Sequence, residues 1–419
     1  MSREVLIVGG GLAGLSCAVQ LQNAGVPYRL FEASDRVGGR VRTDRVDGFL
    51  LDRGFQVFLD AYPEPRRVLD FEALQLQAFL PGALVFTGSR LVRLADPLRC
   101  PAAFGDLVRQ KIAGVRDAVK TLALRRSASR MSADGPSGSR DQATMAFLRE
   151  KGFSARMIDM FWRPFLGGIF LEPDLETSRR MFDFVFGMFT RGRATLPASG
   201  MEAIPRQLAE KLDASRIHLE TPVERIEPNR LWARGESWGA QAVVLAADGW
   251  SAASLVPSLH APQPRGVCNL YFRAARPPYE GPWLALNGAG SGCVNNLAVP
   301  SNVCPSYASG GEALVSVSVL AADARDVDLL PERVRDELSA WFGDQVRAWT
   351  HLRTYHLPHA LPAQNPGWLE PVERPVQLAD GLLVCGDHRD NASIQGAMVS
   401  GRRAAEAVLE QAGAKSGLN

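Results

Sequence analysis

The sequence has no long hydrophobic run, no excess of charge of one sign and no closely spaced pair of cysteines. Its longest apolar stretches, such as 181–189 and 313–322, are shorter than the roughly 18 to 20 residues that span a bilayer. Lys plus Arg number 47 and Asp plus Glu 45, so the chain lacks the basic surface of a dedicated nucleic-acid-binding protein. We therefore expect neither a transmembrane helix nor a nucleic-acid partner.

The cysteines and the N-terminus exclude further classes of protein. The 6 cysteines are scattered and form no Cys-x-x-Cys pair, which disfavours a structural zinc site and a redox dithiol. We expect reduced, mostly buried thiols and no bound metal. The N-terminus shows no charged segment followed by an apolar run and a cleavage site, so no secretory signal is expected. The expected location is the cytoplasm.

The order of strand and helix patterns predicts two interleaved domains. Residues 5–8 form a β-branched run, residues 12–23 a helical pattern and residues 28–31 a second strand, which together predict a βαβ unit. An aromatic-rich helical stretch follows, and strand patterns return near 217–248 and 382–385. We expect one domain to comprise 1–62, 195–265 and 375–419, and the other to comprise 63–194 and 266–374.

A glycine-rich turn connects the first strand to the first helix. Gly9, Gly11 and Gly14 follow the pattern Gly-x-Gly-x-x-Gly, and Glu32 ends the next strand. In a dinucleotide fingerprint the glycines permit a tight turn, close approach of the pyrophosphate and close packing of helix on strand. The acid accepts hydrogen bonds from ribose hydroxyls and repels a 2′-phosphate, so NADP is disfavoured. The pattern predicts a dinucleotide-binding site.

The segment after Glu32 indicates which dinucleotide is bound. Gly38-Gly39-Arg40 follows directly, and here the sequence resembles the flavin-containing amine oxidoreductase superfamily, in its phytoene-desaturase-like and protoporphyrinogen-oxidase-like branch. The resemblance implies non-covalent FAD, with Arg40 as the counter-charge of the pyrophosphate. The implied fold class is α/β, a Rossmann-type (GR2-like) FAD-binding domain interleaved with an α+β substrate-binding domain.

Further motifs extend the resemblance along the chain. Residues 52–56 resemble the turn beneath the flavin ring, 196–205 the Pro-x-x-Gly-Met return to the FAD domain, 221–226 a strand whose valine backbone meets the cofactor, and 386–401 the C-terminal signature. The residues expected to bind FAD are Gly9, Gly11, Leu12, Ala13, Gly14, Glu32, Ala33, Gly38, Gly39, Arg40, Gly54, Phe55, Gln56, Val223, Gly386, Asp387, Gln395, Gly396, Ala397 and Met398.

A second glycine-rich segment, 288–292, competes superficially as a phosphate site. Residues 293–296 after it do not continue as a helix, so we interpret the segment as a hairpin turn. His388 lies beside the signature aspartate, and we expect a solvent-exposed turn histidine there. For His356 we expect an ordinary structural role, and no cysteine near it offers a covalent flavin link.

The aromatic-rich stretch from 161 to 189 is expected to supply the substrate pocket. Such stripes are more often core than pocket, yet a domain that caps a flavin with so many of them fits an apolar tunnel. The arrangement around 163–164 and 171–178 resembles the desaturase-like members, which favours an apolar substrate. The candidates for lining it are Gln56, Arg163, Phe165, Tyr271 and Trp283, with Phe55 beside the reacting face.

The basic stretch 99–130 carries 8 Lys and Arg residues with apolar residues at helical spacing. It could contact an anionic membrane from which a lipid substrate is drawn. The preferred alternative is a helix that packs its apolar stripe inward and exposes a solvated basic face.

The predicted function is an FAD-dependent oxidoreductase that dehydrogenates or desaturates an apolar substrate, isoprenoid-like or polycyclic, by hydride transfer to flavin N5. One alternative is a flavin amine oxidase, although 270–276 and 283–299 lack the lysine that this activity implies. Another is a catalytically inactive FAD-binding partner protein. The sequence assigns no general acid or base, electron acceptor or oligomeric state.

Overall fold

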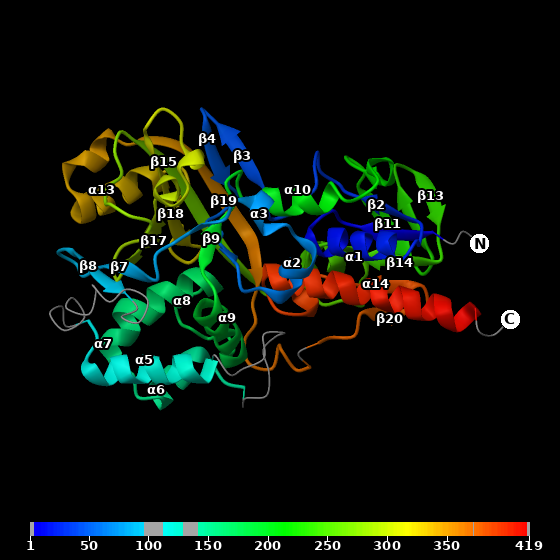
Figure 1. Cartoon of the computed structure of the whole chain (residues 1–419), viewed down its shortest axis with the longest axis horizontal. Helices are drawn as coiled ribbons and strands as arrows, with labels where there is room; N and C mark the ends of the chain where they lie inside the picture. Colours follow the sequence, from blue (N-terminus) through cyan, green and yellow to red (C-terminus); the bar gives the residue numbers. More distant parts are fainter. Residues whose placement is uncertain (1–3, 96–111, 129–140, 372, 417–419) are drawn as a thin grey trace.

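The computed structural model describes residues 4–95, 112–128, 141–371 and 373–416, which form two sheet-based units side by side (Figure 1). The unit near both chain ends is built on a six-stranded sheet. All neighbouring strands in it are parallel except the last pair. In spatial order its strands are β10 (Ile217–His218), β2 (Tyr28–Phe31), β1 (Val5–Val8), β14 (Ala242–Leu245), β21 (Leu382–Val384) and β20 (Gln377–Ala379).

Alternation along the strands explains the layers of this unit. Val5 and Ile7 pack in the core that includes helix α1 (Leu12–Asn23), whereas Leu6 and Val8 pack in a separate core on the opposite face. Helix α14 (Ile394–Ser416) lies against α1. The opposite face is covered by the three-stranded sheet of β11 (Val223–Glu227), β12 (Arg230–Ala233) and β13 (Glu236–Gly239).

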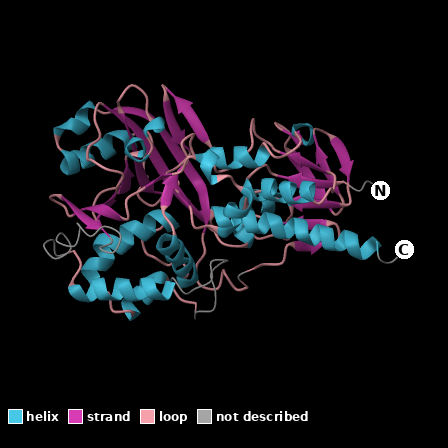
Figure 2. Cartoon of the chain, viewed as in Figure 1, coloured by secondary structure: helices cyan, strands magenta, loops and turns pink. Residues whose placement is uncertain are grey.

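The second unit is built on a seven-stranded, mostly antiparallel sheet (Figure 2). One face packs against α13 (Leu330–Phe342) through Val315, Val317 and Val319. The other face is directed at the site described below. In spatial order the strands are β19 (Thr350–Pro362), β15 (Pro264–Ala274), β18 (Ala313–Leu320), β17 (Val294–Ala298), β16 (Leu284–Asn287), β7 (Gly82–Phe86) and β8 (Leu91–Ala95).

A layer of helices lies below this sheet in Figure 1. It comprises α5 (Val115–Ala128), α6 (Thr144–Glu150), α7 (Ala155–Met157), α8 (Arg163–Phe170) and α9 (Arg179–Arg191), with a π-helical turn over Ile158–Trp162. Ser178 caps α9 by accepting from the amide of Arg180 at 3.0 Å.

The remaining elements are short. They are β3 (Thr43–Val46), β4 (Phe49–Asp52), β5 (Phe58–Leu59), β6 (Gln77–Ala78), β9 (Ala194–Leu196), α2 (Pro63–Val68), α3 (Phe71–Leu74), α10 (Ala203–Ala209), α11 (Gly249–Leu255) and α12 (Pro300–Val303). Among the described helices, none combines the length and the apolar character needed to cross a bilayer.

The elements agree closely with the sequence patterns where these patterns are periodic. The predicted strands at 5–8 and 28–31 and the helix at 12–23 occur with these bounds. The helical stripe predicted within 99–130 is described only from residue 112 onward, and its helix begins at Val115. The domain boundaries stay a prediction, although the strands of the six-stranded sheet come from the segments assigned to the FAD domain.

Candidate active site

One large cavity extends from the glycine turn of the first unit to the helical layer of the second. Its volume is about 2380 Å³. Ordinary ligand pockets measure about 300–1,000 Å³, so this cavity has room for a dinucleotide and a sizeable second molecule. Residues from the turn after β1, from β19, from α5 and from α8 and α9 line the same continuous space.

The glycine turn after β1 is packed so tightly that two of its glycines admit no side chain. A Cβ on Gly14 would lie 1.9 Å from the carbonyl oxygen of Gly9, and a Cβ on Gly9, where φ is +110°, would lie 2.8 Å from the Ala246 oxygen. A Cβ on Gly11 would meet nothing within 4 Å, and Gly11 lines the cavity. Open space is therefore left where a pyrophosphate would approach.

Glu32 lies beside this turn and lines the cavity. Its carboxylate accepts from the Gly10 amide at 2.6 Å and from the amide and hydroxyl of Ser34 at 2.9 and 2.6 Å. These bonds fix the carboxylate at the edge of the groove, where it can accept from ribose hydroxyls. The supporting role of Ser34 was not predicted, since no motif marks it.

Arg40 and Asp387, which come from opposite ends of the chain, meet in the cavity. A guanidinium nitrogen of Arg40 lies 2.7 Å from the Asp387 carboxylate, and another donates to the carbonyl of Ala360 at 2.8 Å. Burial alone would lower the pKa of Arg40, but the Asp387 and Asp248 carboxylates raise it above its ordinary value. The guanidinium therefore stays charged and can serve a phosphate group.

The turn over residues 52–56 passes beneath the cavity. Gly54 has φ +91°, and a Cβ there would lie 3.0 Å from a methyl group of Leu357. The side-chain nitrogen of Gln56 donates to the backbone carbonyls of Arg40 and Arg53, each at 2.9 Å. Gln56 thus holds the turn against the Gly-Gly-Arg segment while it lines the cavity.

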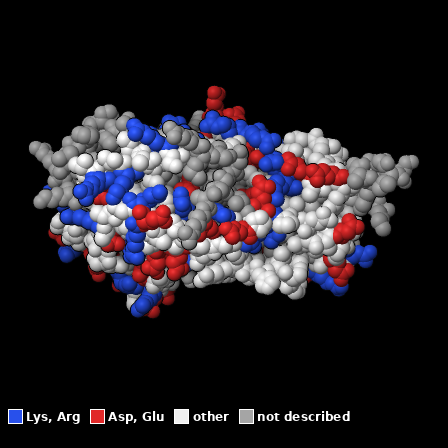
Figure 3. Space-filling model, turned by 90° about the horizontal axis from the view of Figure 1, so that it is seen from below, with Lys and Arg blue, Asp and Glu red and all other residues white. Residues whose placement is uncertain are grey.

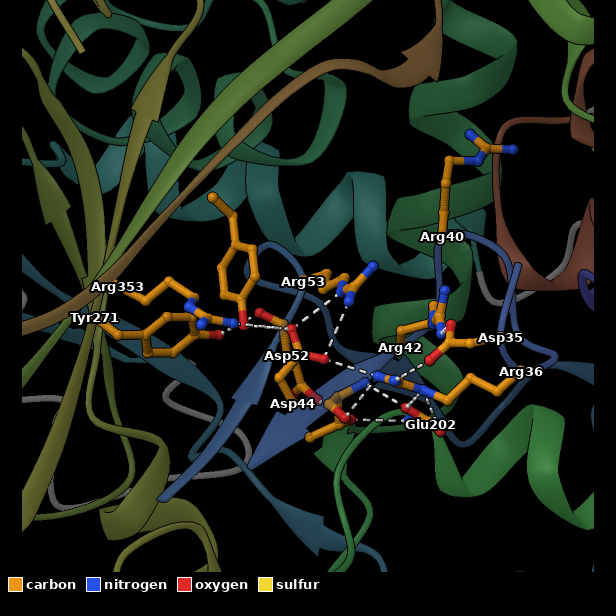
Figure 4. A network of polar contacts seen from close by, with 12 residues as sticks. Asp35, Arg36, Arg40, Arg42, Asp44, Asp52, Arg53, Glu202, Tyr271 and Arg353 are labelled. Carbon is orange, nitrogen blue, oxygen red and sulfur yellow. Dashed lines mark hydrogen bonds and ion pairs between the residues drawn. The ribbon is translucent and has the colours of Figure 1, made fainter. Parts of the chain in front are cut away.

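A buried polar network supports this turn (Figure 4). The Asp52 carboxylate accepts from the hydroxyls of Thr43 and Tyr307 at 2.5 and 2.8 Å and from the Met201 amide at 2.9 Å. Burial raises the pKa of Asp52 to about 6, although the hydrogen bonds that its carboxylate accepts lower the pKa in part. Tyr271 donates to the carbonyl of Asp52 at 2.9 Å, so the network joins the turn to the seven-stranded sheet.

Asp44 lies on β3, the strand paired with the one that carries Asp52, and its pKa is shifted in the opposite direction. Burial would raise the pKa of its carboxyl group, but hydrogen bonds from Arg53, Tyr355 and Arg36 lower it well below the ordinary value. The bonds from Tyr355 and Arg36 both measure 2.7 Å. Two carboxyl groups in one network therefore have pKa values shifted in opposite directions.

The C-terminal signature brings α14 against the glycine turn. A Cβ on Gly401 would lie 2.0 Å from the carbonyl of Ala13, so helices α1 and α14 are in close contact there. Ala397 lines the cavity, whereas Gln395, Gly396 and Met398 lie behind it. Gln395 accepts from the Glu64 amide at 2.9 Å.

Most of the residues predicted to bind FAD line this cavity. The exceptions are Gly14, Gln395, Gly396 and Met398, which shape the helix packing instead. Those that line it are Gly9, Gly11, Leu12, Ala13, Glu32, Ala33, Gly38, Gly39, Arg40, Gly54, Phe55, Gln56, Val223, Gly386, Asp387 and Ala397.

The far part of the cavity is lined mostly by apolar side chains and lies among the helices below the large sheet. Stacked and edge-on rings form its wall, such as the Phe161–Phe165 pair at 5.3 Å. The apolar lining residues on the helical layer are Val115, Ala118, Val119, Leu122, Met157, Phe161, Trp162, Phe165, Ile169, Met181, Val185, Phe186 and Phe189. The aromatic stretch is thus both core and pocket wall, while the contribution of α5 was not predicted.

Three of the predicted substrate-lining residues lie outside the cavity lining. Arg163 donates to the carbonyl of Pro173 at 2.6 Å and pairs with Asp159. Tyr271 is used by the Asp52 network, and Trp283 packs with Ala95 in a small separate core. Hydrogen bonds, an ion pair and packing elsewhere in the fold hold Arg163, Tyr271 and Trp283 outside the cavity lining, and the sequence did not reveal these partners. Gln56 and Phe165 do line the cavity.

The prediction that His388 is exposed to solvent is wrong. Its exposed fraction is 6%, and burial lowers its pKa to about 4. A Cβ on Gly386 would lie 2.6 Å from the His388 ring, and a Cβ on Gly249 would lie 3.1 Å from it. His356 is exposed on β19, as expected for an ordinary structural histidine.

The second glycine-rich segment is a hairpin turn, as predicted. It joins β16 to the antiparallel β17. The Glu337 carboxylate accepts from the amides of Cys293 and Val294 at 2.7 and 3.2 Å. A carboxylate of the chain already binds the amides after this turn, which explains why it offers no phosphate site.

Comparison with known proteins identifies the family. A sequence model of the family described as flavin containing amine oxidoreductase matches residues 12–409. The chain belongs to this family. The match confirms the predicted resemblance, the class of oxidoreductase and a flavin cofactor.

Similar individual proteins and solved structures support this family assignment. The chain is 28% identical to a hydroxysqualene dehydroxylase of Rhodopseudomonas palustris, over 98% of this chain and 99% of the relative. It is 23% identical to protoporphyrinogen oxidase 2 of Arabidopsis thaliana over 58% of this chain, and this match spans only 53% of the relative's length. Cyclohexylamine oxidase from Brevibacterium oxydans has the same fold, with a TM-score of 0.75, 17% identity, and 98% and 99% of the two chains covered. The predicted Rossmann-type fold class is therefore confirmed.

The groove fits the flavin dinucleotide of this family. Gly11 leaves open space at the turn, Glu32 and the Arg40–Asp387 pair lie at its edge, and the volume exceeds that of one ligand. Among the described residues no group of His, Cys, Asp and Glu side chains has the arrangement of a metal site.

Proposed function

We propose that the protein is an FAD-dependent oxidoreductase that dehydrogenates or desaturates an apolar, isoprenoid-like or polycyclic substrate, with FAD bound non-covalently. The observation that carries this proposal is the continuity of one cavity from the glycine turn to the ring-lined pocket. The bound flavin supplies a hydride acceptor at N5, and the proton that balances the lost hydride and new double bond leaves to solvent.

The residues of the chain bind and orient both molecules. Glu32 would accept hydrogen bonds from ribose hydroxyls, Arg40 would offer a counter-charge to the pyrophosphate, and the 52–56 turn would lie against the flavin ring. Side chains such as Phe161 and Phe165 exclude water from the second half of the cavity. A relative whose name denotes an isoprenoid alcohol, the dehydroxylase of Rhodopseudomonas palustris, supports an isoprenoid-like substrate.

An anaerobic screen tests the reaction. Purified holoprotein is mixed with a polyene precursor, a porphyrinogen or an amine, and the flavin absorbance band is followed. We expect bleaching by the polyene precursor or the porphyrinogen. Bleaching by amines alone would instead identify an amine oxidase, and bleaching by dithionite but by no candidate would support an inactive FAD-binding protein.

The cofactor assignment has its own test. Glu32→Ala combined with Arg40→Ala should yield colourless protein, because both polar anchors of the dinucleotide are removed. Arg45→Ala, at an exposed arginine outside the cavity lining, is the control. Release of intact FAD by acid from the wild-type protein would verify non-covalent binding, and stoichiometric FAD retained by the double variant would refute the two roles.

We also propose that α5 contacts a membrane at the entrance of the cavity. Val115 and Val119 are 77% and 61% exposed and line the cavity at the same time. An exposed apolar entrance beside basic side chains suits transfer of a lipid-like substrate. Residues 99–111 and 129–130 of the predicted basic stretch lie outside the described residues.

A further inference from the structure

Two polar side chains interrupt the strand wall of the cavity. Asn296 on β17 and Ser318 on β18 are direct neighbours in the sheet register, and both line the cavity. Their exposed fractions are only 3% and 4%. On the adjoining strands β15 and β16 the lining residues are Val267 and Leu284. The pair is therefore a neutral polar spot in an apolar surface.

The orientation of the Asn296 amide follows from its neighbour. The side-chain nitrogen of Asn295 donates to the carbonyl of Pro164 at 3.0 Å and to the side-chain oxygen of Asn296 at 2.9 Å. A backbone carbonyl can only accept, so it fixes which end of the Asn295 amide is the nitrogen. The nitrogen of Asn296 must then be directed toward Ser318, to whose hydroxyl it donates at 3.4 Å.

The hydrogen bonds of this pair are long. The Ser318 hydroxyl donates to the side-chain oxygen of Asn269 at 3.3 Å and accepts from Asn296 at 3.4 Å. Typical distances are about 2.5–3.0 Å for O–H···O and about 2.7–3.2 Å for N–H···O bonds. Among the described residues the second N–H of the Asn296 amide has no acceptor. Buried polar groups are normally well bonded, so the pair has capacity for a ligand atom.

We propose that Asn296 and Ser318 bind one neutral oxygen group of the apolar substrate, namely a hydroxyl. The Asn296 N–H donates to this oxygen, and the hydroxyl donates in turn to Ser318. An ionised group is disfavoured at this pair, because burial of a charge requires an opposite charge and the cavity-lining residues of β7, β8 and β15 to β18 are uncharged. The charged lining residues Arg125 and Arg191 belong to the helical layer, on α5 and α9. This inference rests on the proposed function and narrows its substrate to apolar alcohols.

Such a contact would also set the position of a long substrate. One oxygen held on β17 and β18 fixes how far an apolar chain extends along the cavity toward the glycine turn. The pair would thus select which carbon atom of the substrate lies at the glycine-turn end of the cavity. Asn296 and Ser318 would bind and position the substrate.

A binding experiment with a matched pair of probes tests the proposal. Geranylgeraniol and the hydrocarbon that lacks only its hydroxyl are titrated into oxidised holoprotein, and dissociation constants are taken from the change in flavin absorbance. We expect the alcohol to bind about tenfold more tightly than the hydrocarbon, as for one well-made hydrogen bond. In Ser318→Ala and in Asn296→Leu the preference should fall below about twofold.

Ser316→Ala is the matched control. Ser316 lies on the same strand and the same face, is 1% exposed and bonds to Asn269, but it does not line the cavity. This variant should retain the tenfold preference. Flavin content and thermal stability are measured for each variant, so that Ser318→Ala decides the question if Asn296→Leu does not fold.

The outcomes separate the subsite from the function on which it rests. Equal affinities in the wild type, or an unchanged preference in Ser318→Ala, would overturn the subsite and leave the proposed oxidoreductase intact. Failure of both probes to bind a protein whose flavin is normal would overturn the apolar-substrate function and the subsite with it.

Discussion

The glycine turn between β1 and α1 is walled by backbone atoms at fixed distances, whereas the apolar half of the cavity is walled by side chains from α5, α8 and α9. At Gly9 and Gly14 the backbone walls admit no larger residue, because a single Cβ meets a carbonyl oxygen. Side-chain walls allow many apolar sequences of similar volume. We infer that the cofactor end is specified residue by residue, and that the substrate end is specified by packing.

Exchanging two glycines of the same turn tests the rigidity of the cofactor end, and here we expect the largest effect. In Gly14→Ala the new methyl group would lie 1.9 Å from the Gly9 oxygen, so the turn must distort. Overpacking of this kind costs about 3 kcal/mol or more, and the protein should lose both FAD and thermal stability.

Gly11→Ala is the comparison within that turn. A Cβ there meets nothing within 4 Å, so the apoprotein should unfold at the wild-type temperature. Its methyl group nevertheless occupies the open space of the groove, so FAD binding should weaken. If both variants lost stability equally, the distinction between a packing glycine and a binding glycine would be wrong. Calorimetry of apoprotein and flavin absorbance of holoprotein provide the two readings.

This difference explains what the sequence could predict. The Gly-x-Gly-x-x-Gly turn, Glu32 and Gly-Gly-Arg are contiguous or nearly so, and local chemistry requires these residue types at these spacings. The placement of Arg163 and Trp283 outside the cavity depends on partners that are distant in sequence or not marked by a motif. Burial of His388 could not be anticipated either, because the glycines around its ring come from 249 and 386.

The Asp52 network, which connects the 52–56 turn to the seven-stranded sheet, could also not be predicted from the sequence. Asp52 was recognised only as the first residue of a turn motif, yet its carboxylate meets Tyr307, far along the chain. An alternating strand pattern predicts that residues such as Tyr271 face one side of a sheet, but it does not predict which group they meet. Long-range polar contacts of this type require the folded structure.

The pH dependence of the free energy of unfolding tests the Asp52 network, and we expect an effect of intermediate size. The pKa of Asp52 is raised from 3.8 to about 6, so the folded protein keeps a proton that the unfolded chain releases above about pH 4. The stabilisation by protonated Asp52 is complete below pH 4 and is lost as the pH rises through 6. The loss amounts to at most about 3 kcal/mol.

Asp52→Asn removes this titration. The free energy of unfolding, measured with denaturant between pH 4 and 7, should fall with pH more steeply in the wild type than in the variant. Titrating groups that are distant from Asp52 and share no partner with it remain in both proteins and cancel in the difference. Parallel curves would show that Asp52 is ionised throughout, and that its hydrogen bonds outweigh its burial.

The entrance of the cavity differs from both of its ends, because exposed apolar and basic side chains occur together there. Figure 3 shows basic and acidic side chains mixed on the face seen from below, so charge alone does not mark a membrane surface. The observation that favours contact is the exposure of Val115 and Val119 on α5. We therefore expect a membrane effect that is small and sensitive to salt.

Reversal of the charges on α5 tests this membrane contact. Replacing Arg116, Lys120, Arg125 and Arg126 by glutamate should weaken sedimentation with phosphatidylglycerol-containing vesicles at least about tenfold at low salt, since each basic residue near an anionic surface contributes about 1 kcal/mol. The control carries glutamate at four exposed arginines elsewhere, Arg45, Arg230, Arg276 and Arg347. If the two variants bound vesicles equally well, α5 would be an ordinary solvated helix, and substrate would enter the cavity from water.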